Sequence, residues 1–316
     1  MSKKIWIIVP VIALILILAF VIKDNHKQGM IKIGYSPYSV NTPLFIAVEY
    51  NLFTKRGLNI ELIPFQSTDQ MAMALQSKQI DVATALTAES VYSRNKKSSI
   101  IRPFFLNIFL SNSIVDAIVV PDKSTISSLK NLEGKRVGIL PADMMRVAFK
   151  SFLENNKVDP TSIEIIAVPP SSILSGMSSG DLDACYILEP LVTISLQKLN
   201  ARIIAEGVGA KGITNPLPAG FHCVHADLIE NSPGIGKKLI EIYEEAATKA
   251  NNRELVVKVL QKYCSLDASI AQHVSLPSWS KWTPRLQNNL CEQFESLKGV
   301  YKWDSSNFTY TNFIKD

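Results

Sequence analysis

The sequence has few cysteines and none of the short motifs that mark common enzyme classes. Its 4 cysteines are too few and too widely spaced for a disulfide scaffold, and no C-x-x-C pair occurs. No G-x-S-x-G, phosphate-binding loop or H-E-x-x-H motif occurs. With 33 basic against 28 acidic side chains, the charge is too balanced to indicate a nucleic-acid partner. We therefore expect no catalytic residue, no cofactor, no metal and no nucleic acid.

The cysteines that are present leave one pairing open. Cys185 lies in an apolar, strand-like run and is expected to be a buried free thiol. Cys264 and Cys291 both fall in the helical part that ends the sequence, so a bridge between them is conceivable. An exported location would permit this bridge without requiring it.

One apolar segment, Ile5 to Ile22, has no charged side chain over its 18 residues and follows Lys3 and Lys4. A helix that spans a bilayer usually has about 20 apolar residues, so this segment is near the lower limit of the required length. No small residues stand at a cleavage-site spacing near Lys23, and no cysteine is there to take a lipid. We favour an uncleaved signal-anchor over a cleaved signal peptide, with a buried soluble helix as the third interpretation.

The two lysines before this segment set its expected orientation. Positive residues stay on the cytoplasmic side, so the folded part from about residue 30 onward is expected on the periplasmic or extracellular side of the cell membrane. The expected membrane contact is residues 5–22, with 1–30 as the whole signal segment.

Two series of short β-branched runs alternate with amphipathic stretches, which predicts an α/β fold with mainly parallel sheets. Turn-forming segments at 125–134 and 211–218 separate the series. The strands expected in the first series are 31–35, 59–65 and 82–86; those in the second are 136–140, 163–168, 184–188 and 202–205; a strand at 219–225 and several helices follow. The helices expected between them are 43–51, 69–77 and 143–155, with others opening near Ala88, Ser172 and Pro190.

Ligands of open parallel sheets bind beyond the carboxyl ends of the strands, beside helix N-termini. This rule selects five loops, which converge only if the two series face each other across a cleft. The expected ligand-binding residues are Ser36, Pro37, Tyr38, Thr42, Thr68, Asp69, Thr87, Ala88, Glu89, Pro141, Ala142, Asp143 and Glu189. Tyr38 can stack on a flat ligand, and the serine and threonine hydroxyls can either cap helices or donate to the ligand.

The acidic members of this set bear on the class of ligand. If two of them line the cleft as bare carboxylates, an amine-bearing ligand is favoured over nitrate or a sulfonate. No Arg or Lys occurs in the five loops. The basic cluster Arg94, Lys96 and Lys97 is interpreted as a solvated helix end. His222, Cys223 and His225 lie in one strand whose neighbourhood supplies no further ligands, so we expect no zinc there.

The stretch from Gly34 to Ser90 resembles the opening of ABC-transporter solute-binding proteins of the nitrate, sulfonate, taurine and thiamine-pyrimidine-precursor group. The matching motifs are Asn51-Leu52-Phe53 with Gly57-Leu58-Asn59-Ile60, Ala74-Leu75 with Gln79-Ile80-Asp81, LKNLEGKRVG at 129–138 and GDLDACYILEP at 180–190. The family often has Gly where this chain has Asn51 and Lys78. Residues 31 to about 250 carry the resemblance.

The resemblance implies a two-lobed type 2 periplasmic-binding-protein fold. By that likeness the first lobe comprises residues 31–118 and 218–316, and the second comprises 119–217. It also implies the function: an extracytoplasmic solute-binding protein that captures a small organic ligand between its lobes and delivers it to an ABC permease with its ATPase. Two alternatives stay open. One is a ligand-sensing receptor domain for a membrane signalling partner. The other is an enzyme on the same fold, related to thiamine-pyrimidine synthesis; the cysteine-rich motif of those enzymes is missing.

Overall fold

The computed structural model describes residues 29–95, 100–232, 234–283, 285–286 and 288–289. The expected apolar helix at 5–22 lies outside these residues, and so does Cys291. Within the described ranges, no helix combines the length and the apolar character needed to cross a membrane.

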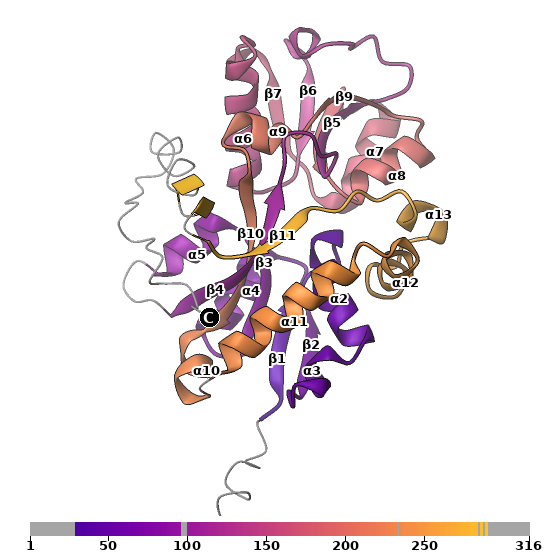
Figure 1. The fold of residues 1–316 in the computed structure, drawn as a ribbon. Coiled ribbons are helices and arrows are strands. Elements are labelled where there is room, and N and C mark those ends of the chain that lie inside the picture. The colour runs from indigo at the N-terminus through magenta and orange to yellow at the C-terminus, as the bar shows by residue number, and fades with distance from the viewer. Residues whose placement is uncertain (1–28, 96–99, 233, 284, 287, 290–316) are drawn as a thin grey trace, which may run out of the picture.

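Six strands form the first sheet, in the order β11-β4-β10-β3-β1-β2 (Figure 1). Strand β1 pairs in parallel with β2 and β3, whereas β10 is antiparallel to both β3 and β4. The bounds are β1 Ile31–Tyr35, β2 Ile60–Pro64, β3 Val82–Leu86, β4 Ile101–Phe109, β10 Leu217–His225 and β11 Ser278–Lys281. We call the part of the chain built on this sheet the first lobe.

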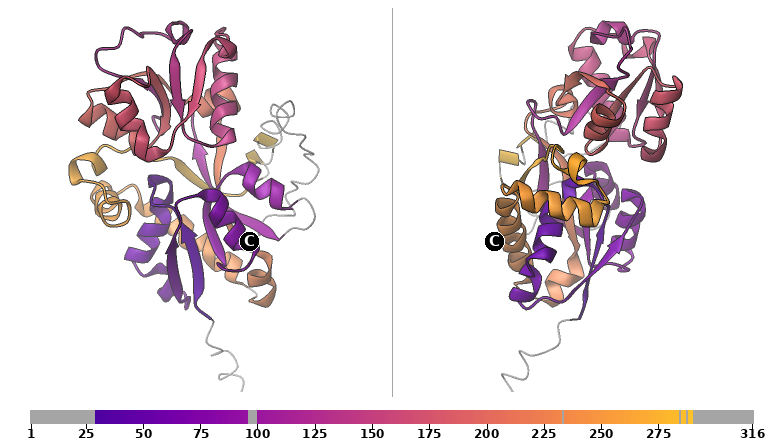
Figure 2. Two further views of the ribbon diagram at one scale, coloured as in Figure 1. Left: turned by 180° about the vertical axis from the view of Figure 1, so that it is seen from behind. Right: turned by 90° about the vertical axis from the view of Figure 1, so that its right-hand side faces the viewer.

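The second sheet has five strands in the order β7-β6-β8-β5-β9, and the part of the chain built on it is the second lobe (Figures 1 and 2). Strand β6 is parallel to β7 and β8, and β5 is antiparallel to β8 and β9. The bounds are β5 Asp116–Val120, β6 Arg136–Ile139, β7 Glu164–Ala167, β8 Ala184–Leu188 and β9 Arg202–Glu206.

Helices cover the faces of both sheets. Those of the first lobe are η1 Ser39–Asn41, α2 Thr42–Glu49, α3 Leu52–Lys55, α4 Thr68–Gln76, α5 Ala88–Asn95, α10 Ala226–Asn231, α11 Ile235–Lys249, α12 Arg253–Cys264 and α13 Ala268–Ala271. Those of the second lobe are η2 Leu129–Leu132, α6 Asp143–Asn155, η3 Pro160–Ser162, α7 Pro170–Ser179, α8 Leu191–Lys198 and α9 Val208–Gly212. The expected strands at 82–86 and 184–188 and the expected helix at 143–155 are confirmed residue for residue.

The first sheet separates two hydrophobic clusters because successive strand residues point to opposite faces. Val82 packs on one side with α2 and α11, where Phe45 and Tyr243 are fully buried. Ala83 packs on the other side with α4, where Leu75 is fully buried. This burial on both faces fixes the register of β3, and with it the position of the loop that follows.

Strands β4 and β5 were not among the strands expected from the sequence. Strand β4 reads IRPFFLNIF, a nearly continuous apolar run interrupted by Pro103, and lacks the alternation that indicates a strand. Proline cannot donate to a ladder hydrogen bond, and the pairing of β10 with β4 shifts register between His222 and Cys223, opposite Pro103. Pairing with β10 and β11 on either side makes this segment a strand.

The chain crosses between the lobes twice, at residues 110–115 and at residues 213–216. The sequence placed the first boundary between 118 and 119, which falls inside β5. Because β5 pairs along its length with β8 and β9, the crossing precedes it. The second expected boundary, between 217 and 218, falls at the start of β10.

Candidate functional site

The loop after β1 contains four buried polar side chains, Ser36, Ser39, Asn41 and Thr42. The Nδ2 of Asn41 donates to the backbone oxygen of Ser36 at 2.8 Å, and the Oγ1 of Thr42 donates to that of Ser39 at 2.6 Å. These bonds hold the loop in one shape at the carboxyl end of β1. Within the described ranges, the Oγ of Ser39 and the Oδ1 of Asn41 have no hydrogen-bond partner.

Two further predicted residues, Pro37 and Tyr38, are half-buried in the same loop. Burial raises the pKa of the Tyr38 hydroxyl above its usual value, so this group is a neutral donor at physiological pH. A half-buried phenol at a strand end can both stack on a ligand and donate to it.

The loops after β2 and β3 are joined by their side chains. The Oγ of Ser90 donates to the Oδ1 of Asp69 at 2.8 Å, and the Oγ1 of Thr87 accepts from the backbone N–H of Ser90 at 3.2 Å. Thr68 and Glu89 are half-buried, and Ala88 is buried. The start of α4 and the start of α5 therefore form one continuous surface.

Strand β3 is kinked immediately before this loop. Ala85 has a φ of 52°, and the pairing of β3 with β10 shifts register at the same place. A side chain in this left-handed region costs about 1 kcal/mol or more, so surrounding packing must hold it. A bulge of this kind changes the direction of the strand that follows, here towards Thr87.

The interpretation of Arg94 as part of a solvated helix end is wrong. Its side chain is only 16% exposed and turns back from α5. The Nη1 donates to the backbone oxygen of Ser90 at 3.2 Å, and the Nη2 donates to that of Asp69 at 3.4 Å. The five predicted loops contain no Arg or Lys because Arg94 lies about one and a half turns inside α5, beyond the loop that precedes the helix. Lys96 and Lys97 lie outside the described residues.

The predicted loop of the second lobe meets these first-lobe loops. Pro141 is exposed and Ala142 is half-buried, and Asp143 opens α6. The next residue, Met144, packs against a hydrophobic cluster that contains Ala88 of the first lobe and Val147 of α6, and Phe65 of the first lobe packs against the same cluster. The three loops at residues 67–69, 87–90 and 141–144 therefore gather around one hydrophobic cluster.

The other two loops meet at a second cluster. Val40, from the loop after β1, packs in the same cluster as Leu188, which precedes Glu189. Phe109 of β4 belongs to this cluster, and Leu110, the next residue, packs against the first one. The two groups of loops are thus neighbours along the end of β4, between the two sheets.

Glu189 is buried, and its carboxylate oxygens are used within the chain. The Oε1 accepts from the Oγ1 of Thr193 at 2.7 Å and from the backbone N–H of Ser275 at 2.9 Å, and the Oε2 accepts from the N–H of Thr193 at 3.0 Å. Burial raises the pKa of Glu189, and these hydrogen bonds oppose the rise. Neither Glu189 nor Asp69 is a bare carboxylate, which weakens the expected preference for a cationic ligand.

Two cavities lie away from these loops. One, of about 600 Å³, lies between α11 and β11 and includes Glu244, Trp279 and Lys281 in its lining. The other, of about 500 Å³, lies beside α7. None of the thirteen predicted residues lines either cavity.

Among the described residues, no group of three or more His, Cys, Asp and Glu side chains is placed to hold a metal ion. His222 and Cys223 face opposite sides of β10. The Nε2 of His222 lies 3.1 Å from the Oδ1 of Asn107, and the Nδ1 of His225 accepts from the backbone N–H of Asp227.

Comparison with protein families matches residues 24–261 to the NMT1-like family. A Bacillus subtilis protein named for binding aliphatic sulfonates is 24% identical over 229 residues, which cover 70% of this chain and 66% of that protein. The taurine-binding periplasmic protein of Escherichia coli is 26% identical over 196 residues, covering 62% of this chain and 59% of that protein. The chain thus spans about two thirds or less of the length of these relatives.

A solved structure shares the arrangement of elements. The periplasmic aliphatic sulphonate-binding protein SsuA of Escherichia coli superposes with a TM-score of 0.73 at 17% identity, covering 88% of this chain and 91% of that one. The expected two-lobed fold of periplasmic binding proteins is thereby confirmed.

Proposed function

The chain belongs to the NMT1-like family, and we propose that it is an extracytoplasmic solute-binding protein. In this proposal it captures a small organic ligand between its two lobes and delivers the ligand to an ABC permease and its ATPase. The observation that carries the proposal is the convergence of loops from both sheets around Val40 and Met144, in a chain whose relatives are named as binding proteins.

We propose that binding closes the lobes by rotation at the two crossings, 110–115 and 213–216. The proposed ligand-binding residues are those expected from the sequence other than Glu189, whose carboxylate oxygens accept from Thr193 and Ser275. The loop from Ser36 to Thr42 forms the first-lobe wall. The segment at 5–22 tethers the folded part to the membrane, with both lobes on the extracytoplasmic side. This arrangement would keep the protein close to its permease.

The charges around Asp69 and Arg94 bear on which class of ligand the site can bind. Asp69 is bonded to Ser90, and the Arg94 guanidinium lies 3.9 Å from the same carboxylate. The acidic residues are therefore partly neutralised, and a sulfonate or a zwitterion such as taurine is compatible with the site. The names of the relatives favour a sulfonate or taurine. The lack of Arg and Lys within the five loops themselves favours an amine-bearing ligand instead.

The proposal is tested by a thermal-shift panel of aliphatic sulfonates, taurine, nitrate, pyrimidines and aromatic acids. A ligand present at 100 times its dissociation constant should stabilise the protein by about 2.7 kcal/mol, and small-angle scattering should show a more compact molecule. Tyr38→Ala should reduce the shift, whereas Tyr50→Ala, at an exposed position just after the C-terminal end of α2, should not. If no compound stabilises the protein or compacts it, the proposal fails.

The relatives are named as binding proteins, and this favours binding over catalysis. Incubating the purified protein with each compound that stabilises it, followed by mass spectrometry of the products, tests this point. Recovery of the compound unchanged is the expected result, and turnover would support the enzyme alternative.

A further inference from the structure

The two lobes are connected by a third segment besides the two crossings. Residues 265–277, which contain α13, run from α12 to β11 within the first lobe and lie against α8 of the second lobe (Figures 1 and 2). Ile194 of α8 packs in the cluster formed by Leu260, Ile270 and Val274. We call residues 265–277 the strap.

The strap is fixed firmly to the first lobe by one guanidinium. Arg253, at the start of α12, donates to the backbone oxygens of Ala271, Gln272 and Val274 at 2.7, 2.8 and 2.9 Å. Three hydrogen bonds from a planar, charged group leave the strap little freedom relative to α12. Any relative motion of the lobes about the two crossings must therefore also change the contact between the strap and α8.

Glu189 occupies that meeting point. One oxygen of its carboxylate accepts from Thr193 of the second lobe and from Ser275 of the strap, and the other accepts from the backbone N–H of Thr193. The group is 3% exposed, so water does not compete for these bonds. Hydrogen bonds to a buried charged group are among the stronger ones in proteins.

The remaining polar contacts between α8 and the strap are weaker. Gln197 donates to the backbone oxygen of Ser269 at 3.4 Å, and the Oγ1 of Thr193 lies 3.4 Å from the backbone oxygen of His273. Lys198 lies 3.6 Å from Asp267, with side chains that are 57% and 72% exposed. Exposed pairs of this kind contribute little. Glu189 is thus the principal polar link between α8 and the strap among the described residues.

We propose that Glu189 is a positioning residue that links α8 to the strap and thereby sets how far the two lobes can separate in the ligand-free protein. In this proposal it acts on the geometry of the site instead of contacting the ligand. The inference rests on the proposed function only in its consequence for binding, because the link itself can be measured without a ligand.

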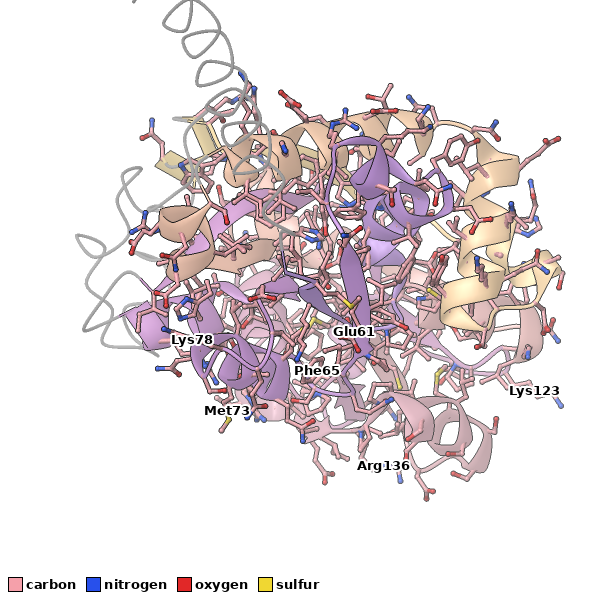
Figure 3. All side chains as sticks on the ribbon, turned by 90° about the horizontal axis from the view of Figure 1, so that it is seen from below. Glu61, Phe65, Met73, Lys78, Lys123 and Arg136 are labelled. Carbon is pink, nitrogen blue, oxygen red and sulfur yellow. The ribbon has the colours of Figure 1, made fainter. Side chains whose placement is uncertain are left out.

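The first measurement is the distance between the lobes. Glu61 in β2 and Lys123 after β5 are exposed and lie in different lobes (Figure 3). The full chain would carry spin labels at Glu61→Cys and Lys123→Cys, with Cys264→Ser and Cys291→Ser; Cys185 and Cys223 are buried. Pulsed electron resonance on the ligand-free protein then reports the distribution of distances between the lobes.

Glu189→Gln should widen or shift this distribution by about 3 Å or more. The Oε2 of Glu189 accepts a hydrogen bond from the backbone N–H of Thr193, whereas the amide NH₂ of glutamine at that position is a donor and cannot accept it. Thr193→Val, which removes one donor, should have a smaller effect in the same direction. Gln197→Ala is the matched control on the same helix and should leave the distribution unchanged. A residue with a purely structural role would lower thermal stability without changing the distribution.

The second measurement is amide hydrogen exchange at Ser275, whose N–H donates to Glu189. Glu189→Gln should raise the exchange rate by about tenfold, and Gln197→Ala should not. If folded Glu189→Gln keeps both the wild-type distribution and the wild-type exchange, the proposal is overturned. If Gln197→Ala changes both as much as Glu189→Gln, the link is not specific to Glu189 and the proposal is also overturned. Both measurements use the ligand-free protein, so their outcomes do not depend on the thermal-shift panel. Failure of the Glu189 link can therefore be distinguished from failure of the proposed solute-binding function.

Discussion

The side chain of Asp116 accepts a hydrogen bond of 2.8 Å from the hydroxyl of Tyr186, and both residues are fully buried on neighbouring strands of the second lobe. The same carboxylate oxygen accepts from the backbone N–H of Gly209 at 2.6 Å. Asp116 begins β5 directly after the first crossing, and Gly209 lies in α9 shortly before the second, so one carboxylate connects the two second-lobe elements that adjoin the crossings. Burial raises the pKa of Asp116 to about 6.

We predict that Asp116 makes the protein less stable as the pH rises. Its pKa is about 6 in the folded protein and 3.8 when exposed. The folded state therefore binds the proton more tightly than the unfolded chain does. The free energy of unfolding should fall by roughly 2–3 kcal/mol as the pH rises from about 4 to about 6.5. Asp116→Asn cannot titrate, so the difference in urea midpoint between wild type and variant should change across this window. Parallel profiles would contradict the prediction.

We predict the opposite pH dependence for His222. Burial lowers its pKa from 6.5 to about 3, and it lies among Phe104, Phe105 and Tyr243. The unfolded chain takes up the proton first, so the stability present above about pH 6.5 is lost as the pH falls. This loss should reach on the order of 2–3 kcal/mol by about pH 4.5. In His222→Gln the acid-side slope of the urea midpoint should become shallower; an unchanged slope would show that His222 does not titrate in this range.

The two groups act in opposite directions over overlapping pH windows, so the wild-type profile alone can be nearly flat. The double variant Asp116→Asn with His222→Gln provides the control. The residues lie in different lobes, so their effects on the slope should add. A double variant whose slope departs from the sum would show that the two lobes couple in unfolding.

We predict a large effect of Gly207→Ala. Gly207 has a φ of +59°, and a Cβ there would lie 2.4 Å from the backbone oxygen of Ser111. The left-handed backbone and the collision together should lower the free energy of unfolding by about 3 kcal/mol or more. Gly57→Ala is the matched control, with a φ of +73° and no atom within 4 Å of the added Cβ. It should cost about 1 kcal/mol. Equal losses in urea unfolding would show that the contact with Ser111 yields.

We predict that Arg94 orders the loops of the candidate site. Arg94→Gln removes the guanidinium that donates to the backbone oxygens of Ser90 and Asp69. Amide exchange at residues 67–70 and 87–91 should accelerate, and any ligand-induced thermal shift should shrink. Arg56→Gln is the control, because Arg56 pairs with Glu245 on the surface of α11. If both variants leave exchange in these loops unchanged, Arg94 does not hold them.

Local structure was largely predictable from the sequence. The helix at 143–155 and the strands at 82–86 and 184–188 follow from periodicity, which depends only on residues near one another in the chain. Ile235, Leu239, Ile242 and Ala246 are spaced on one helix face, and all are buried in α11. Most of the predicted loops also meet, because parallel strands end at a common edge.

Tertiary structure alone decided the rest. Strand β4 exists because β10 and β11 pair with it, and both lie more than a hundred residues further along the chain. The amount of charge left for a ligand depends on Arg94 turning back onto Asp69 and on Ser275 donating to Glu189. A sequence shows which side chains can donate or accept hydrogen bonds. The partners that form those hydrogen bonds come from distant segments of the chain. The sequence by itself determined the α/β class and the loops; long-range pairing decided which of their polar groups remain for function.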